Sequence, residues 1–180
     1  ACEIHSMSME FLTWDWMHLF FEEDTEKFLF KHLAGSLAFL PYGALVDHFQ
    51  HWVYENPTSS PKERKKQWLS LEKIYQPDKN YDDLYFLKNG GLWQKQAHIY
   101  QMPFYYIDYT LAQICAFQFW IKMQENKDQA WKDYLNLCKA GGSMSFLELV
   151  KLAKIKSPFD ANVFKDVAFK INKWLDENSL

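Results

Sequence analysis

Apolar side chains follow one another closely from residue 3 to residue 21, with polar residues scattered among them. The apolar members are Ile4, Met7, Phe11, Leu12, Trp14, Leu19 and Phe20. Such a dense pattern is typical of a helix that is largely buried rather than of an amphipathic surface helix. The sequence therefore predicts a buried helix here, and the polar residues on it need partners.

Helical spacing of apolar residues continues from residue 25 to residue 55, where Asn56-Pro57 ends it. Within this stretch Pro41 marks a kink or a restart of the helix, because proline removes one backbone hydrogen bond. Ser60-Pro61, followed by Glu63, supplies an N-cap residue and a first-turn proline for a third helix. We expect that helix to end near Gln76-Pro77.

In the second half of the chain, one irregular stretch is followed by several helical patterns. Residues 78–97 read as a loop with short helical pieces, and helices are expected from Pro103 to residue 121, then over 127–139, 145–154 and 160–177. Six glycines and six prolines in 180 residues are too few for an all-β protein with many tight turns. We therefore expect an all-α bundle of roughly seven helices, with residues 1–180 as a single helical unit.

Composition and charge exclude several classes of protein. Hydrophobic residues make up 48% of the chain, which excludes disorder, and the net charge of −3 with no long basic run argues against a nucleic-acid partner. No apolar run near 20 residues is evident, so no membrane partner is expected. Three cysteines cannot form a disulfide framework, and we expect free thiols in a cytoplasmic protein.

The acidic residues gather near the beginning of the chain, where residues 1–60 carry nine acids and two bases. Glu3 and Glu10 stand two helical turns apart, so they project from one face of the first helix. A carboxylate on a buried helix needs a counter-charge, a metal or hydrogen bonds. The pair therefore belongs either to a site or to a structural network.

Two further groups of residues could carry chemistry. His48 and His51 stand three residues apart on a helix, close enough for one metal ion, although two separately satisfied histidines are the more common arrangement. His98 precedes a tyrosine-rich turn in which Tyr106 and Tyr109 would share a helix face. Phenol hydroxyls in such a place can donate hydrogen bonds to an oxyanion, or they can form a packing layer with backbone partners.

Three segments in this order resemble the C-terminal part of the oligoendopeptidase F zinc metallopeptidases, which are relatives of thimet oligopeptidase. The segments are Glu3-Ile4-His5-Ser6-Met7-Ser8-Met9-Glu10-Phe11-Leu12, His48-Phe49-Gln50-His51-Trp52-Val53-Tyr54-Glu55-Asn56-Pro57 and Pro103-Phe104-Tyr105-Tyr106-Ile107-Asp108-Tyr109. The resemblance covers essentially the whole chain. It implies the helical catalytic domain of a zincin-like oligopeptidase that hydrolyses internal bonds of short peptides.

The resemblance also implies roles for particular residues. Glu3 matches the third Zn²⁺ ligand of the family, and Glu10 matches an acid that supports the zinc-binding helix by hydrogen bonding. His98 and Tyr105 match residues that bind substrate, and Tyr106 and Tyr109 match the tyrosines that approach the scissile carbonyl. One residue fewer separates His98 from the tyrosines here than in thimet oligopeptidase.

The sequence departs from the family in one respect. None of its six histidines lies in the His-Glu-x-x-His pattern that supplies two Zn²⁺ ligands and the general base. The chain therefore reads as a fragment of a longer peptidase, with the missing N-terminal part as its partner, and the fragment alone is expected to be inactive. The alternative is a non-catalytic helical module that binds peptides or proteins in an aromatic groove.

Overall fold

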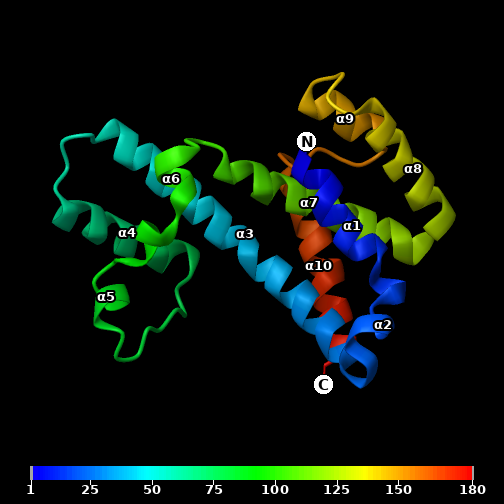
Figure 1. Cartoon of the computed structure of the whole chain (residues 1–180), viewed down its shortest axis with the longest axis horizontal. Helices are drawn as coiled ribbons and strands as arrows, with labels where there is room; N and C mark the ends of the chain where they lie inside the picture. The colour runs from blue at the N-terminus through cyan, green and yellow to red at the C-terminus, as the bar shows by residue number, and fades with distance from the viewer. Residues whose placement is uncertain (1, 180) are drawn as a thin grey trace. The chain divides into compact units, whose positions relative to one another are not determined.

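A computed structural model describes residues 2–179, and the described residues are helical without any strand (Figure 1). They divide into two compact units, residues 2–37 with 111–179 and residues 38–110. The first unit contains α1 (Cys2–Leu12), η1 (Trp14–Trp16), α2 (His18–Phe21), η2 (Glu22–Asp24), α8 (Lys127–Ala140), α9 (Phe146–Leu152) and α10 (Ala161–Glu177). The second contains α4 (Pro61–Tyr75), α5 (Tyr85–Lys88), η3 (Leu92–Lys95) and α6 (Ala97–Gln101), and both units include parts of α3 (Thr25–Glu55) and α7 (Tyr106–Glu125). The prediction of an all-α fold is confirmed. The prediction that residues 1–180 form a single helical unit stays a prediction.

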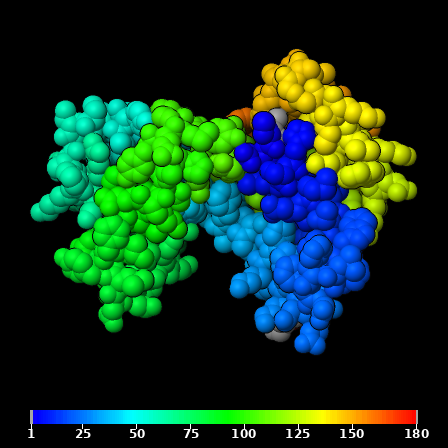
Figure 2. Space-filling view, in the orientation of Figure 1, coloured from blue at the N-terminus to red at the C-terminus, as the bar shows by residue number. Residues whose placement is uncertain are grey.

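The first helix ends at Leu12, and the expectation of one buried helix through residue 21 is wrong beyond that point. The Thr13 hydroxyl donates to the carbonyl oxygens of Met9 at 2.9 Å and Glu10 at 3.2 Å, which occupies acceptors at the helix end. Past this break the apolar side chains of Leu19 and Phe20 are 65% and 74% exposed. The space-filling view shows this blue segment on an open face of the first unit (Figure 2).

Helix α3 runs unbroken over 31 residues with Pro41 inside it, so the helix does not restart there. Buried neighbours such as Leu40 and Leu45 hold both sides of the proline in place and offset the lost backbone hydrogen bond. By length and composition alone, the segment Trp14–Glu55 could cross a membrane, with a mean hydropathy of 1.3 in its most apolar window. This corrects the sequence expectation of no such segment, although core helices of soluble proteins pass the same test.

Local capping chemistry sets several of the other helix ends. Ser60 and Glu63 form the expected capping box of α4, with Ser60 N to Glu63 Oε2 at 2.7 Å and Glu63 N to Ser60 Oγ at 3.3 Å. These hydrogen bonds hold the pKa of Glu63 below its ordinary value. Helix α7 begins at Tyr106 rather than at Pro103, because Phe104 has a φ of 61°, which a right-handed helix cannot include.

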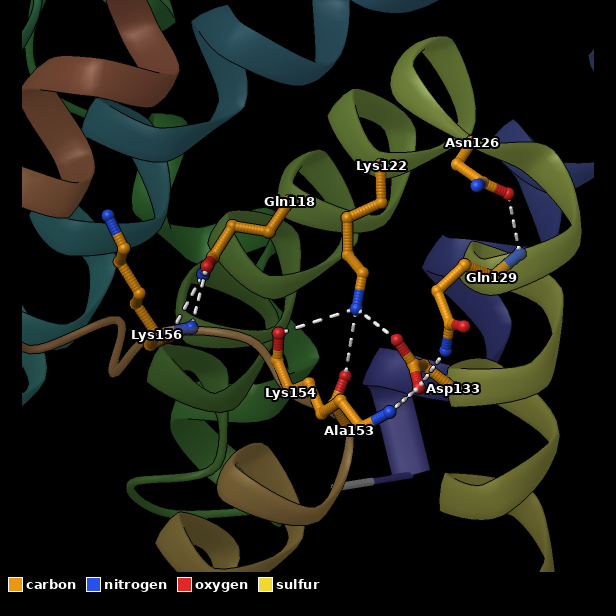
Figure 3. A network of polar contacts seen from close by, with 8 residues as sticks. All are labelled: Gln118, Lys122, Asn126, Gln129, Asp133, Ala153, Lys154 and Lys156. Atoms are coloured by element: carbon orange, nitrogen blue, oxygen red, sulfur yellow. Dashed lines mark hydrogen bonds and ion pairs between the residues drawn. The ribbon is translucent and has the colours of Figure 1, made fainter.

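A buried carboxylate joins three elements of the first unit. Asp133 on α8 has a side chain only 1% exposed and accepts from Lys122 Nζ at 2.5 Å, Lys154 Nζ at 3.1 Å and Gln129 Nε2 at 2.9 Å (Figure 3). Burial acts to raise the pKa of Asp133, but the hydrogen bonds from both lysines outweigh it and the pKa lies below its ordinary value. Lys122 also donates to the carbonyl oxygens of Ala153 and Lys154, which ties α7 to the segment after α9.

The second unit has its own core, in which α3, α4 and the segment before α7 meet. Its buried members are Leu45, Val46, Phe49, Trp68, Leu71, Leu92, Trp93, Ile99 and Tyr106. Within this unit Gly43 allows α3 and Thr110 to approach closely, since a Cβ at Gly43 would lie 2.0 Å from Thr110 Oγ1. This core places the beginning of α7, with its tyrosines, against α3 and the segment that carries His98.

Candidate active site

His98, Tyr106 and Tyr109 form one cluster in the second unit. The His98 ring centroid lies 5.1 Å from that of Tyr106 and 5.6 Å from that of Tyr109, both in edge-to-face geometry. His98 Nε2 is 3.4 Å from Tyr109 Oη, and the two tyrosine rings are 5.5 Å apart. The structure therefore brings together three of the residues that the sequence singled out.

The turn between α6 and α7 sets the position of these tyrosines. Phe104 adopts a left-handed backbone conformation, and its ring contacts those of His51 at 4.8 Å and Tyr54 at 5.1 Å on α3. Tyr105 follows directly and packs edge-to-face on Tyr109 with centroids 5.4 Å apart. Tyr105, the second residue expected to bind substrate, thus borders the cluster.

Tyr106 is the most enclosed of these tyrosines, at 8% exposed. Burial, together with the neighbouring Tyr42 hydroxyl, raises the pKa of Tyr106 to about 12, while a hydrogen bond with the Gln96 side chain opposes the rise. The phenol therefore stays protonated throughout the neutral range and can donate a hydrogen bond. A protonated donor in a partly water-excluded place is what oxyanion stabilisation requires.

His98 is half-buried, and its second ring nitrogen distinguishes it from a surface histidine. Nδ1 is buried and has no hydrogen-bond partner among the described residues. A buried N–H without an acceptor costs more free energy than a buried unprotonated ring nitrogen whose lone pair accepts no hydrogen bond. The neutral tautomer with the proton on Nε2 therefore fits this environment. In that tautomer His98 faces Tyr109 with a donor.

Glu3 and Glu10 lie in the first unit, on α1, each with a local contact of its own. The Ser6 hydroxyl donates to Glu3 Oε2 at 3.3 Å, and Glu3 is half-buried near the beginning of the helix. Glu10 Oε2 lies 3.0 Å from His32 Nε2, and the Glu10 side chain is 58% exposed. These two contacts are made with different side chains of the first unit.

The described residues hold no cluster of three or more histidine, cysteine, aspartate or glutamate side chains able to bind a metal ion. His48 Nδ1 lies 3.1 Å from Tyr75 Oη, and His51 Nε2 lies 3.6 Å from Asp47 Oδ2. The structure favours two separately satisfied histidines over a His48 and His51 metal pair. Glu3 can serve as one carboxylate ligand, so residues 2–179 fit part of a metal site and not a whole one.

Sequence reasoning missed the residues around Tyr106 that do not belong to the tyrosine run. Gln96 donates from Nε2 to Tyr42 Oη, and the Tyr42 ring lies 6.2 Å from that of Tyr106. Tyr42 is 54 residues from Gln96 in the chain, so no local spacing relates them. The one available signal was the position of Gln96 two residues before His98.

Comparison with known proteins agrees with the helical fold. Peptidase family M3 matches residues 1–169. Among solved structures, PZ peptidase A with an inhibitor shares 57% identity over 98% of this chain, with a TM-score of 0.96. A protein assigned as an oligoendopeptidase F shares 56% over 99% of the chain with a TM-score of 0.96, and one so assigned from Bacillus anthracis str. Ames shares 52% over 99% with a TM-score of 0.83.

The matched structures are much longer than this chain. The chain covers 31%, 32% and 29% of them respectively, or about a third of their length. No curated protein matches the chain. Because the family profile extends over more than nine tenths of the sequence, the chain belongs to peptidase family M3.

Proposed function

We propose that this chain is the C-terminal part of a zinc-dependent oligopeptidase of the oligoendopeptidase F type, which hydrolyses internal bonds of short peptides in the cytoplasm. Membership of family M3 and the peptidase names of the similar structures support this assignment. The three described cysteines are free thiols, in keeping with a reducing compartment. The remainder of the peptidase is the partner of this chain.

The cluster of His98, Tyr106 and Tyr109 carries the proposal. Hydrolysis of a peptide bond places negative charge on the former carbonyl oxygen, and two phenols on one face of α7 can donate to it. His98 and Tyr105 lie beside these two phenols and would contact the peptide on either side of the bond that is cleaved. The high pKa of Tyr106 keeps its proton available for donation over the whole working range.

Glu3 would supply one ligand of the metal, and residues outside this chain would supply the others. When bound, Zn²⁺ polarises a carbonyl group and lowers the pKa of a bound water molecule. Glu10 would support the metal-binding segment through a hydrogen bond, in addition to its contact with His32. A single carboxylate does not hold zinc, so we expect the 180-residue chain to be inactive alone.

The decisive experiment uses the full-length peptidase and internally quenched peptides of about 5 to 15 residues. We expect internal cleavage that a chelator abolishes and Zn²⁺ restores, with products identified by mass spectrometry. The coding sequence upstream of Ala1 should encode His-Glu-x-x-His roughly 25 residues before Glu3. Its absence, together with no cleavage of any peptide, would overturn the assignment.

The second candidate is a non-catalytic helical module that binds a peptide or protein. The observation in its favour is the exposed apolar segment of the first unit, where Trp16, Leu19 and Phe20 are each more than half exposed. Such a module needs no metal. Peptide binding by a full-length protein that retains no zinc and cleaves nothing would favour it.

A further inference from the structure

The turn before α7 contains a phenylalanine in a backbone conformation that favours glycine. Tyr105 N donates to the carbonyl oxygen of Met102 at 3.3 Å, which closes a turn with Pro103 and Phe104 in its middle. Proline suits the second position of such a turn, whereas Phe104 at the third position has a φ of 61°. A Cβ atom makes this left-handed region unfavourable, so glycine or asparagine usually occupies it. The ring of Phe104 therefore needs contacts that offset this cost.

Two residues on α3, one helical turn apart, make these contacts. The ring centroid of Phe104 lies 4.8 Å from that of His51 and 5.1 Å from that of Tyr54, both in tilted geometry. Residues three apart on a helix are neighbours on its surface, so His51 and Tyr54 form one aromatic surface, here called the α3 aromatic pair. Aromatic rings at such separations attract each other beyond the effect of their burial.

Other contacts of α3 fix the position of the α3 aromatic pair. Phe49 is fully buried, and its ring centroid lies 5.2 Å from those of both Trp68 and Trp93 in the core of the second unit. Nε2 of His51 lies 3.6 Å from Oδ2 of Asp47, which stands one helical turn earlier. The helix therefore offers the turn before α7 a surface that is anchored in the core.

The conformation of Phe104 determines how α7 begins. The carbonyl oxygen of Tyr105 accepts a hydrogen bond from Asp108 N at 3.0 Å, and α7 begins at Tyr106. The direction in which the chain leaves Phe104 therefore sets the direction of Tyr106 and Tyr109. Phe104 is 41% exposed, so its ring lies at the edge of the unit rather than in its core. Its removal should disturb the turn more than the folding of the unit.

We propose that Phe104, His51 and Tyr54 are positioning residues for peptide hydrolysis. The α3 aromatic pair holds Phe104 in its left-handed conformation, and this conformation directs the hydroxyls of Tyr106 and Tyr109 toward the scissile carbonyl. The proposal rests on the proposed peptidase function. It also gives a role to the α3 segment whose sequence resembles the oligoendopeptidase F family. None of the three positioning residues needs to touch the substrate.

Substitutions of Phe104 separate the effect of the ring from that of the backbone. Phe104→Ala removes the ring but keeps a Cβ atom, so the left-handed conformation loses its support. Phe104→Gly also removes the ring, but glycine adopts this conformation without a steric penalty. Phe104→Tyr keeps a ring of the same shape. Tyr85→Ala is the matched control, because the Tyr85 side chain is 80% exposed in the same unit.

In the full-length peptidase we expect Phe104→Ala to lower kcat on the order of 10- to 100-fold with KM changed less than about threefold, as for loss of oriented oxyanion donors. Phe104→Gly should lose less than Phe104→Ala, and Phe104→Tyr should recover most of the lost kcat. Tyr85→Ala should leave both constants unchanged. An unchanged kcat in Phe104→Ala would overturn the proposal, and so would an equal loss in Phe104→Tyr.

Double substitutions test whether the ring acts through the named residues. Phe104→Ala should lower kcat by a smaller factor in a Tyr109→Phe protein than in the wild type, because one of the two hydroxyls is already absent. Tyr54→Leu should lower kcat in the wild type and have little further effect beside Phe104→Ala. Strictly multiplicative losses in both pairs would overturn the positioning role.

A second measurement does not depend on activity. In the full-length protein labelled with 3-fluorotyrosine, Tyr106→Phe and Tyr109→Phe assign the ¹⁹F resonances of the two tyrosines. Both resonances should move in Phe104→Ala and in His51→Ala, and not in Tyr85→Ala. Unmoved resonances would overturn the action of Phe104 on the tyrosines, whereas moved resonances in a protein that cleaves no peptide would overturn only the proposed function.

Discussion

Nδ1 of His32 accepts a hydrogen bond from the indole N–H of Trp14, with 3.0 Å between the two nitrogens. An indole nitrogen can only donate, so the neutral imidazole carries its proton on Nε2. Nε2 lies 3.0 Å from Oε2 of Glu10 and donates to that carboxylate. The direction of the Glu10 side chain is therefore fixed through His32 by a tryptophan four residues further along the chain.

The substitution Trp14→Phe tests this relay. Phenylalanine keeps an aromatic ring against Trp174, whose centroid lies 5.6 Å away, but leaves Nδ1 of His32 without its donor. We expect a loss of about 1 to 3 kcal/mol in the free energy of unfolding, measured by urea denaturation of the 180-residue chain. Trp16→Phe, at a side chain 55% exposed, should change it by less than about 0.5 kcal/mol. Equal effects of the two variants would show that the hydrogen bond contributes nothing.

Tyr109→Phe should lower kcat of the full-length peptidase on the order of 100-fold with little change in KM, because the hydroxyl would act only on the transition state. Tyr106→Phe should act in the same direction. Steady-state kinetics on one quenched peptide measures both. Tyr85→Phe is the matched control, since its side chain is 80% exposed in the same unit. A rise in KM with an unchanged kcat would assign the tyrosines to substrate binding instead.

The parts of the fold that depend on neighbouring residues in the chain could be predicted from the sequence. The Ser60, Pro61 and Glu63 pattern placed the beginning of α4 because capping is a contact over three residues. The end of α1 at Leu12 was missed, since apolar periodicity continued past it and the hydroxyl of Thr13 gave only a weak signal. The hydrogen bonds of Thr13 to Met9 and Glu10, rather than the apolar pattern, mark the end of that helix.

The candidate site divides in the same way. Tyr106 and Tyr109 were singled out because three residues of spacing place them on one helix face, and the structure brings both of their rings near His98. Tyr42 packs on Tyr106 and accepts a hydrogen bond from Gln96, and these contacts exist only after α3 has packed against the segment before α7. The roles of Glu3, Glu10 and Tyr105 stay predictions.

Glu3→Gln tests the metal role in the full-length peptidase. An amide is a weaker ligand than a carboxylate, so the zinc content after dialysis against a mild chelator should fall below half of the wild-type value. Glu10→Gln should weaken zinc affinity by about 10- to 100-fold if Glu10 supports the metal-binding segment, and less than Glu3→Gln does. Atomic emission of the dialysed proteins measures both. Full zinc retention in Glu3→Gln would remove Glu3 from the ligand set.

Asp133→Asn should lower the free energy of unfolding by about 3 to 5 kcal/mol at pH 7, since it leaves Lys122 and Lys154 beside a buried neutral amide. The pKa of Asp133 is lowered in the folded chain, so its stabilisation is fully present above its ordinary pKa of 3.8 and is lost as the pH falls through the lower folded value. The difference between wild type and variant should therefore shrink below about pH 4. Urea denaturation at pH 7 and pH 3 measures it. Asp128→Asn, exposed in the first turn of the same helix, should cost less than about 1 kcal/mol at pH 7.

Gly43→Ala tests the close approach of α3 and the beginning of α7 in the second unit. The new Cβ would lie 2.0 Å from Thr110 Oγ1, so the backbone or the threonine must move, at a cost of about 1 to 3 kcal/mol in the free energy of unfolding. Because Thr110 follows Tyr109 directly, we also expect a lower kcat of the full-length peptidase.

The compensating change is Thr110→Ala, which removes a buried hydroxyl without a partner among the described residues. The double variant should recover most of the stability and activity that Gly43→Ala loses, and thermal denaturation of all four proteins closes the cycle. Gly35→Ala is the matched control, since nothing lies within 4 Å of its added Cβ and alanine is the better helix former by about 1 kcal/mol. Strictly additive effects of the two substitutions would show that Gly43 and Thr110 do not limit the approach of the two helices.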